Sequence, residues 1–204
     1  MKNQPKLTEK NLIRARKVMF DVIEFMDDEG IEYCLEGGTL LGIVRDGDLL
    51  PWDHDIDLSI LYKDANKFAE RIPSLINKGY RVTKGKVDKE TKGLKKGEYR
   101  VFKVKRLIPS IFKIIFPIFK RYMVVADVFV KFKEDDNIYW QAMEKTMRVN
   151  EIYYSSNETV EYMGKKLSVP YKYKEYLTEK YGDWSIPQKD WSCGTDEKTI
   201  IEDI

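Results

Sequence analysis

The chain of 204 residues contains little cysteine and histidine: two cysteines, Cys34 and Cys193, and one histidine, His54. Two cysteines are too few for a disulfide framework and are compatible with a reducing compartment. These three side chains are also too few for a four-ligand zinc site built from cysteine and histidine alone. The first residues contain no apolar run, so we expect neither a signal peptide nor a spanning anchor there.

Internal repeats and low-complexity segments are also lacking, and hydrophobic residues make up 43% of the chain, a globular composition. A chain of this length is long enough for one well-filled core and short for two. We therefore expect a single domain over residues 1–204, with a basic and apolar insertion at about 84–121. The composition does not indicate disorder.

Hydrophobic periodicity predicts alternating helices and strands followed by β-rich sequence. We expect a helix from Thr8 to Gly30, a helix capped by Asp64 and ended by Gly79, and a helix opened by Pro170 that runs through Tyr181. The expected strands are IEYCLEGG, HDIDLSIL, YRVTKG, EYRVFKVK, MVVADVFVKF and KKLSVP, with TLLGIVRDG as a short helix. This order predicts an α+β fold, a mixed β-sheet flanked by helices.

The stretch GGTLLGIVRDGDLLPWDHDIDL, residues 37–58, carries the strongest chemical signal. In an extended backbone Asp53, Asp55 and Asp57 lie on one side, because strand side chains alternate between two faces. Such carboxylates repel each other unless a cation or a proton relieves the charge. Hard oxygen ligands suit Mg²⁺ or Mn²⁺, which bind one or two carboxylates together with substrate phosphate oxygens. Metal-dependent phosphate chemistry is therefore the leading hypothesis.

The Gly37–Gly38 pair precedes these carboxylates and supplies backbone that a phosphate can approach closely. We expect Thr39 to cap the helix that follows, whose N-terminus favours anions. The alternative is an ordinary turn next to a solvated acidic loop. The alternation of Ile56, Leu58 and Ile60 with the carboxylates favours a half-buried strand instead.

The same stretch resembles the signature of the LicD family, nucleotidyltransferase-fold enzymes that include bacterial phosphocholine transferases and, more distantly, fukutin and fukutin-related protein. The family pattern is Gly-Gly-Thr-Leu-Leu-Gly, an arginine, then Pro-Trp-Asp-Asp-Asp-Ile-Asp. It corresponds here to 37–42, Arg45 and 51–57, with His54 in place of the middle aspartate. The strand VVADVFV places Asp127 where the family has an acidic residue on a neighbouring strand. The later segment YLTEKYGDW agrees as well.

The resemblance implies metal-dependent transfer of a phosphorylated, phosphocholine-like alcohol from a CDP-alcohol donor to a sugar hydroxyl. Asp55 and Asp57 would hold magnesium against the donor pyrophosphate. Asp127 would complete the metal site or take the proton of the acceptor hydroxyl. Asp53 would bind a second metal ion or orient the first through water, or simply cap a turn. Arg45 would contact phosphate, or alternatively pair with the acidic cluster.

His54 departs from the family pattern and leaves donor preference open. On a strand it would point away from the carboxylate face, which favours a structural role over that of a general base. Four tryptophans and thirteen tyrosines could supply a cage for a choline-like cation, yet aromatic residues are more often core, so the sequence assigns no cage.

A basic block from Lys84 to Arg121 contains thirteen Lys or Arg and three acidic residues, whereas the whole chain has a net charge of +2. Such a block favours a polyanionic partner or an anionic membrane surface, or is merely a solvated face. Within it, RLIPSIFKIIFPIFKRY is too short and too proline-interrupted to span a bilayer. It would be an interfacial segment, a substrate lid or a core element. We expect no nucleic-acid partner, because no recognisable RNA-binding motif is present.

Three hypotheses for the whole chain remain open. The first is a phosphoalcohol transferase that acts on a cell-surface glycan or its lipid-linked precursor, as in polysaccharide, lipopolysaccharide or teichoic acid biosynthesis. The second is a nucleotidyltransferase that acts on a small molecule or sugar. The third is a catalytically silent membrane or glycan adaptor. We expect a cytoplasmic protein, with the basic block a candidate for peripheral contact at the inner face of the membrane.

Overall fold

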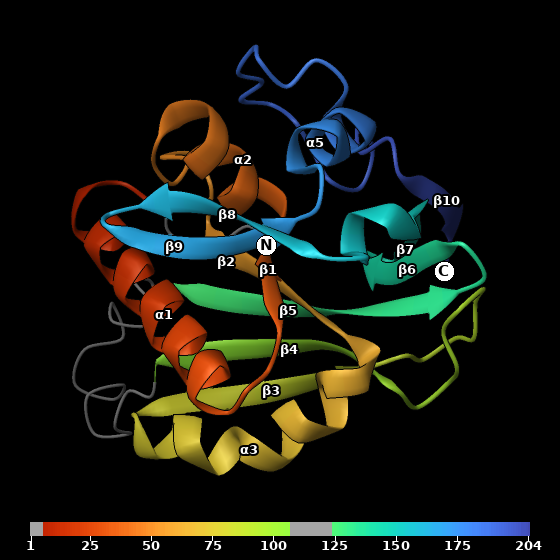
Figure 1. The fold of residues 1–204 in the computed structure, drawn as a ribbon, viewed down its shortest axis with the longest axis horizontal. Coiled ribbons are helices and arrows are strands. Elements are labelled where there is room, and N and C mark those ends of the chain that lie inside the picture. Colours follow the sequence, from red (N-terminus) through yellow and green to blue (C-terminus); the bar gives the residue numbers. More distant parts are fainter. Residues whose placement is uncertain (1–5, 107–123) are drawn as a thin grey trace.

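The computed structural model describes residues 6–106 and 124–204, and all structural statements below refer to these residues. Its elements follow one another along the chain (Figure 1): α1 (Glu9–Asp28), β1 (Tyr33–Leu35), α2 (Gly37–Asp46), β2 (Asp55–Leu61), η1 (Tyr62–Asp64), α3 (Ala65–Asn77), β3 (Tyr80–Lys86), β4 (Tyr99–Arg106), β5 (Val125–Glu134), β6 (Asn137–Ala142), β7 (Lys145–Asn150), η3 (Glu151–Tyr154), β8 (Asn157–Tyr162), β9 (Lys165–Pro170), α5 (Tyr173–Tyr181) and β10 (Ile200–Asp203).

A mixed sheet organises the fold, and β5 is its central strand. The first half of β5 lies between β2, to which it runs parallel, and β4, to which it runs antiparallel. Its last residues pair with β6 instead, and the sheet continues through β7 to β10. Beyond β4 the sheet ends with β3, which pairs with β4. Beyond β2 it ends with β1, which pairs with β2. The hairpin of β8 and β9 forms a separate two-stranded sheet.

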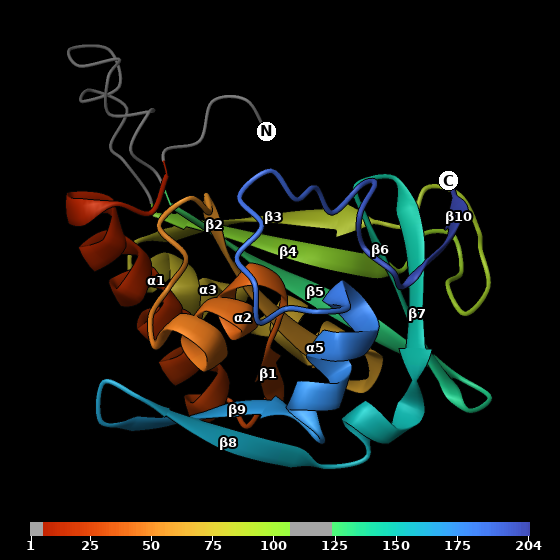
Figure 2. The same cartoon turned by 90° about the horizontal axis from the view of Figure 1, so that it is seen from above.

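The two faces of the sheet have different roles because side chains alternate along each strand. Ile56, Leu58 and Ile60 on β2 are at most 1% exposed and join the core, which α1 and α3 cover. The intervening side chains of β2 belong to the opposite face. In Figure 2, α1, α2 and α3 lie in the left half of the view and α5 to their right, whereas in Figure 1 α3 is at the bottom and α2 and α5 are at the top. The acidic residues of β2 therefore lie on the face that the two long helices do not cover.

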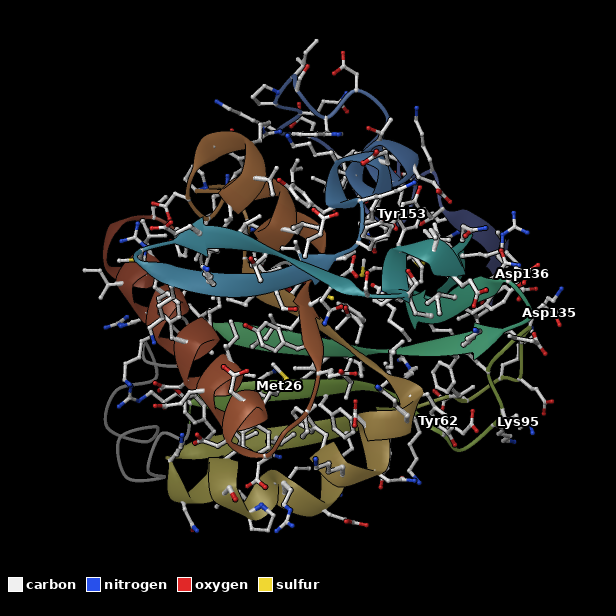
Figure 3. All side chains as sticks on the ribbon, viewed as in Figure 1. Met26, Tyr62, Lys95, Asp135, Asp136 and Tyr153 are labelled. Atoms are coloured by element: carbon white, nitrogen blue, oxygen red, sulfur yellow. The ribbon has the colours of Figure 1, made fainter. Side chains whose placement is uncertain are left out.

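Helix α1 forms as the apolar spacing predicts. Ala15, Met19, Val22 and Met26 recur at steps of three or four and are fully buried. Met26 is labelled in Figure 3, on α1. Around the other end of the fold, the rings of Tyr153 and Tyr176 meet edge to face with centroids 5.3 Å apart and join η3 to α5.

Several local predictions need correction. Thr8 and Asp64 occupy the N-cap positions of α1 and α3, but neither side chain makes a capping hydrogen bond. Pro170 is the last residue of β9 rather than the start of a helix, and α5 begins at Tyr173, since the prolyl ring continues the extended chain. The glycine pair forms the first turn of α2 rather than a turn before it, so Thr39 lies inside this helix and is not its cap.

The α+β prediction is confirmed: the molecule has a mixed sheet flanked by helices. The described part of the basic block comprises the end of β3, the connecting residues 87–98 and β4. The apolar segment RLIPSIFKIIFPIFKRY falls, from Leu107 onward, outside the described residues. In the described part of the chain, no helix combines the length and the apolar character needed to cross a bilayer.

Candidate active site

A cavity of about 560 Å³ opens beside the carboxyl-rich face of the sheet. It is lined by all four acidic side chains predicted from the sequence, which are Asp53, Asp55, Asp57 and Asp127. Its walls come from the N-terminal half of α2, the end of α5 and the segment 183–193 that follows it. The cavity thus brings together residues from both ends of the described chain.

The carboxylates come together through the parallel pairing of β2 and β5. Asp57 is the register partner of Asp127, and Asp55 is the partner of Val125. Cross-strand partners present their side chains to the same face of a sheet, so Asp57 and Asp127 lie next to each other. Asp53 precedes β2, which begins only at Asp55. Its side chain nevertheless enters the cavity and accepts a hydrogen bond from the backbone N–H of His54 at 2.8 Å.

Burial and mutual repulsion shape the protonation of this cluster. Burial raises the pKa of Asp55 to about 7, and the nearby charges of Asp53 and Asp127 add to the shift. Burial also raises the pKa of Asp57 well above its usual value, with further contributions from Asp55 and Asp53. Carboxyl groups held this close take up protons unless a cation compensates their charge. A cation in this site would therefore lower the electrostatic repulsion among the carboxylates.

Helix α2 approaches the carboxylates so closely that a side chain at either of its first two positions would displace one of them. Gly37 has a left-handed φ of 54°, and a Cβ there would overlap the carboxylate of Asp57. A Cβ on Gly38 would overlap the carboxylate of Asp53. Thr39 fixes this arrangement from within the helix, because its Oγ1 accepts the backbone N–H of Asp57 at 2.9 Å. The N-terminus of α2, which favours anions, thus lies against the acidic floor.

Asp127 has one occupied and one free carboxylate oxygen. Oδ2 forms an ion pair with Lys103, its register partner on β4. Oδ1 is buried and has no hydrogen-bond partner among the described residues. A buried acceptor without a partner is costly, which points to a ligand group or a metal ion at this position. Lys103, a residue that the sequence analysis did not select, reaches from Asp127 toward solvent with 42% of its side chain exposed.

Arg45 lines the cavity, but it does not pair with the acidic cluster. Its guanidinium binds both carboxylate oxygens of Asp46, at 2.7 and 2.9 Å, and donates to the backbone carbonyl of Trp184 at 3.3 Å. It also lies 5.8 Å from the ring centroid of Trp52. The alternative of a salt bridge to Asp53, Asp55 or Asp57 is therefore wrong, because Arg45 forms its salt bridge with the next residue, Asp46.

His54 lines the cavity as well, although strand alternation placed it on the opposite face. The alternation does not apply to it because β2 begins one residue later. Its Nδ1 is buried without a hydrogen-bond partner in the described parts of the chain. The cavity also contains four tryptophans, which are Trp52, Trp140, Trp184 and Trp191.

A buried charge network lies behind the N-terminus of α2, and sequence reasoning missed it. Glu36 is the N-cap of α2 and accepts the backbone N–H of Gly37 at 3.1 Å. Its carboxylate also lies 3.0 Å from the ammonium groups of both Lys131 and Lys180. The hydroxyls of Tyr154 and Tyr176 donate to it at 2.8 and 2.6 Å.

Burial alone would raise the pKa of Glu36, but Lys131 and Lys180 outweigh that effect and hold the pKa well below the usual range. Burial lowers the pKa of Lys131 to about 8 in spite of Glu36. Lys180 also binds Glu197 at 2.9 Å, which joins the C-terminal segment to the network. The network fixes the position of Gly37 and hence of the α2 N-terminus. A lone Glu before a Gly-Gly pair was the only signal in the sequence that could have suggested it.

The carboxylates fit a magnesium or manganese ion by their chemistry. Asp55 and Asp57 are hard oxygen ligands whose pKa values are raised by burial and by the neighbouring carboxylates, and Asp127 has a free buried oxygen beside them. Among the described residues, however, no group of three or more Asp, Glu, His or Cys side chains forms a ready metal cage. In general, Mg²⁺ binds proteins through one or two carboxylates and completes its shell with water and substrate phosphates.

These features define the class of protein. The sequence profile described as "LicD/FKTN/FKRP, nucleotidyltransferase domain" matches residues 30–172, and the chain belongs to this family. Its fold is that of the family's nucleotidyltransferase domain, and the predicted resemblance is confirmed.

Two curated relatives align over shorter stretches. An uncharacterised protein of Rickettsia typhi is 33% identical over 82 residues, which are 40% of this chain and 26% of that protein. The human ribitol 5-phosphate transferase FKRP is 49% identical over 43 residues, 21% of this chain and 9% of that protein. The chain therefore spans about a quarter or less of the length of these relatives.

A solved structure also resembles the fold in outline. The lincomycin-bound lincosamide antibiotic adenylyltransferase LnuA covers 84% of this chain and 85% of its own, with a TM-score of 0.47 and 16% identity. A likeness at this level carries no information about the substrate.

Proposed function

We propose that this protein transfers a phosphorylated, phosphocholine-like alcohol from a CDP-activated donor to a sugar hydroxyl of a cell-surface glycan or its lipid-linked precursor. The observation that carries the proposal is the convergence of four carboxylates beneath a helix N-terminus whose first two residues are glycines. A pyrophosphate donor is served by both features, because backbone N–H groups of the helix N-terminus donate to its oxygens and the carboxylates hold the cation that neutralises it. Family membership supports the same assignment.

In this proposal Asp55 and Asp57 hold magnesium or manganese, which when bound offsets the negative charge that develops on the leaving nucleotide. The backbone of Gly37 and Gly38 lines the cavity directly beside the carboxylates of Asp57 and Asp53, so donor phosphates held by the cation would lie close to it. Three of the five N–H donors of the Arg45 guanidinium bind Asp46 and the Trp184 carbonyl, so its remaining N–H donors are the ones that would bind phosphate. Asp53 supports Asp55, with which it forms a hydrogen bond when one of the two is protonated.

The acceptor hydroxyl attacks the phosphorus that bears the alcohol, and the bond from that phosphorus to the CMP oxygen breaks. The products are CMP and the glycan phosphodiester, and the hydroxyl proton must go to a base. Asp127 Oδ1 is the free buried acceptor that faces the reacting groups, so Asp127 either takes this proton or completes the metal site. Lys103 keeps the other oxygen of Asp127 in place.

Product analysis tests the proposal. The protein is incubated with Mg²⁺, CDP-choline, CDP-ribitol or CDP-glycerol and candidate glycans, and mass spectrometry identifies which half of the donor reaches the acceptor. We expect CMP release and a mass increase equal to the phosphorylated alcohol. Transfer of the nucleotide half would instead establish the nucleotidyltransferase alternative. Inactivity with every donor, combined with glycan binding, would establish the adaptor alternative.

A further inference from the structure

Two rows of side chains extend from the carboxylates across the sheet to its edge. In the first row Asp55 on β2 is followed by Val125 on β5, Lys105 on β4 and Arg81 on β3. In the second row Asp57 is followed by Asp127, Lys103 and Thr83 on the same strands. Since register partners share one face, the acidic site continues directly into a basic strip on the outer strands. We call Arg81, Thr83, Lys103 and Lys105 the basic strip.

The outer end of the basic strip holds charge that the fold does not compensate. Arg81 and Lys105 are direct cross-strand partners, and like charges in that position destabilise a sheet. Neither forms an ion pair within residues 6–106 and 124–204. By contrast, Lys84 and Lys86 on the same strand β3 lie over the ring of Tyr99 at 5.6 and 5.2 Å. An uncompensated cationic pair beside an active site indicates an anionic ligand.

The shape of the strip favours an extended, polar anion over a membrane. Arg81 and Thr83 are exposed, and Lys105 is half-buried. None of the exposed large apolar side chains in the described parts of the chain lies on the two rows, whereas a membrane-binding surface inserts apolar groups between its cations. With strands about 4.8 Å apart, Lys105 and Arg81 lie roughly 10 and 14 Å from the Asp55 strand, the range of a chain that continues outward from the reacting hydroxyl.

We propose that the basic strip binds a phosphate-bearing acceptor glycan, with the reacting hydroxyl at Asp127 and phosphate groups of the acceptor against Lys105 and Arg81. This inference rests on the proposed function, because it assigns the acceptor end of the same reaction. Lys103 links the two parts, since it contacts Asp127 and still exposes 42% of its side chain.

The test measures binding of linear polyphosphate to the 204-residue chain by isothermal titration calorimetry, with Mg²⁺ and CDP present in excess to occupy the donor region. The variant Arg81→Gln/Lys105→Gln is compared with Lys84→Gln/Lys86→Gln, which removes the same charge from the far end of β3, outside the basic strip. We expect the Kd to rise about tenfold in the first variant and less than about twofold in the control, with the difference shrinking at high salt.

An equal loss of polyphosphate affinity in both double variants would show that only net charge matters, and would contradict the proposed binding at the basic strip. Unchanged binding in both, or binding to phosphatidylserine vesicles or oligo(dT) with none to polyphosphate, would also overturn it.

A separate measurement of CMP release from the CDP-alcohols without acceptor distinguishes the two proposals. If wild type and Arg81→Gln/Lys105→Gln release CMP equally but polyphosphate binding does not depend on the strip, this inference fails and the proposed function stands. If the strip binds polyphosphate and no donor is cleaved, the proposed function fails instead.

Discussion

Asp57 and Asp127 are direct register partners on the parallel strands β2 and β5. Both belong to the floor of the cavity, and burial together with the other carboxylates raises the pKa of Asp57 well above its usual value. Two acidic side chains placed side by side weaken the fold unless a cation or a proton joins them. This pair therefore links the stability of the protein to its proposed chemistry.

The substitution Asp57→Asn should separate stability from activity. It keeps the size of the side chain and removes a charge, so the metal-free protein should be as stable as wild type or slightly more stable. Donor turnover should fall by about two orders of magnitude or more, since a cation ligand is lost. The matched control is Asp135→Asn in the exposed turn between β5 and β6 (Figure 3), which should change neither quantity. Full activity of Asp57→Asn in the presence of a chelator would contradict the metal assignment.

The metal-free protein should lose stability between pH 5.5 and pH 8. The pKa of Asp55 is raised to about 7 in the folded state, so the folded state binds more protons than the unfolded state at acidic pH. Stability is thus greatest below the unfolded pKa of about 4 and declines as pH rises toward 7. We expect a loss on the order of 2 kcal/mol in urea unfolding with EDTA present.

The variant Asp55→Asn is the control for this pH dependence, because it removes one of the two titrating groups and should make the decline shallower, with the remainder due to Asp57. Magnesium should restore much of the stability of wild type at pH 8 and little at pH 5.5, where protons compete for the same oxygens. Parallel pH profiles of wild type and Asp55→Asn would show that Asp55 does not titrate in this range.

Gly38→Ala should damage the site more than the fold. The added Cβ would overlap the carboxylate of Asp53, which must move out of the cavity floor. We expect a stability loss of about 1–3 kcal/mol, as for other overpacked positions, and a much larger relative loss of donor cleavage. Gly47→Asn at the C-terminus of the same helix is the control: nothing lies within 4 Å, and asparagine tolerates its φ of 73°. If the Gly38→Ala and Gly47→Asn proteins cleave donor equally well, the close approach of α2 is not needed.

Glu36→Gln should destabilise the protein strongly. The change leaves Lys131 and Lys180 buried with one carboxylate, Glu197, between them, and uncompensated buried charge typically costs about 3–5 kcal/mol. The control Glu32→Gln removes a carboxylate that pairs with Lys63 at the surface, and such pairs contribute at most about 1 kcal/mol. Chemical denaturation measures both values. Similar midpoints for the two variants would mean that Glu36 is not the centre of the network.

The sequence alone determined the elements with strong local patterns. The spacing of Ala15, Met19, Val22 and Met26 predicted α1, and the alternation around Asp55 and Asp57 predicted β2, because both periods follow from backbone geometry over a few residues. The family signature and the α+β class also followed from the residues themselves. The predicted boundaries were wrong at glycine and proline, which occur both inside and next to regular elements. The glycine pair begins α2 instead of preceding it, and Pro170 ends β9 instead of opening a helix.

Only the tertiary structure decided which distant residues meet. The parallel pairing of β2 with β5 places Asp127 beside Asp57, and the antiparallel pairing of β4 brings Lys103 to the same row. Glu36, Lys131, Lys180 and Glu197 come from separate segments and meet in a buried network. Such contacts depend on how helices and strands pack over the whole core, and no local periodicity encodes the register of one strand against another far along the chain.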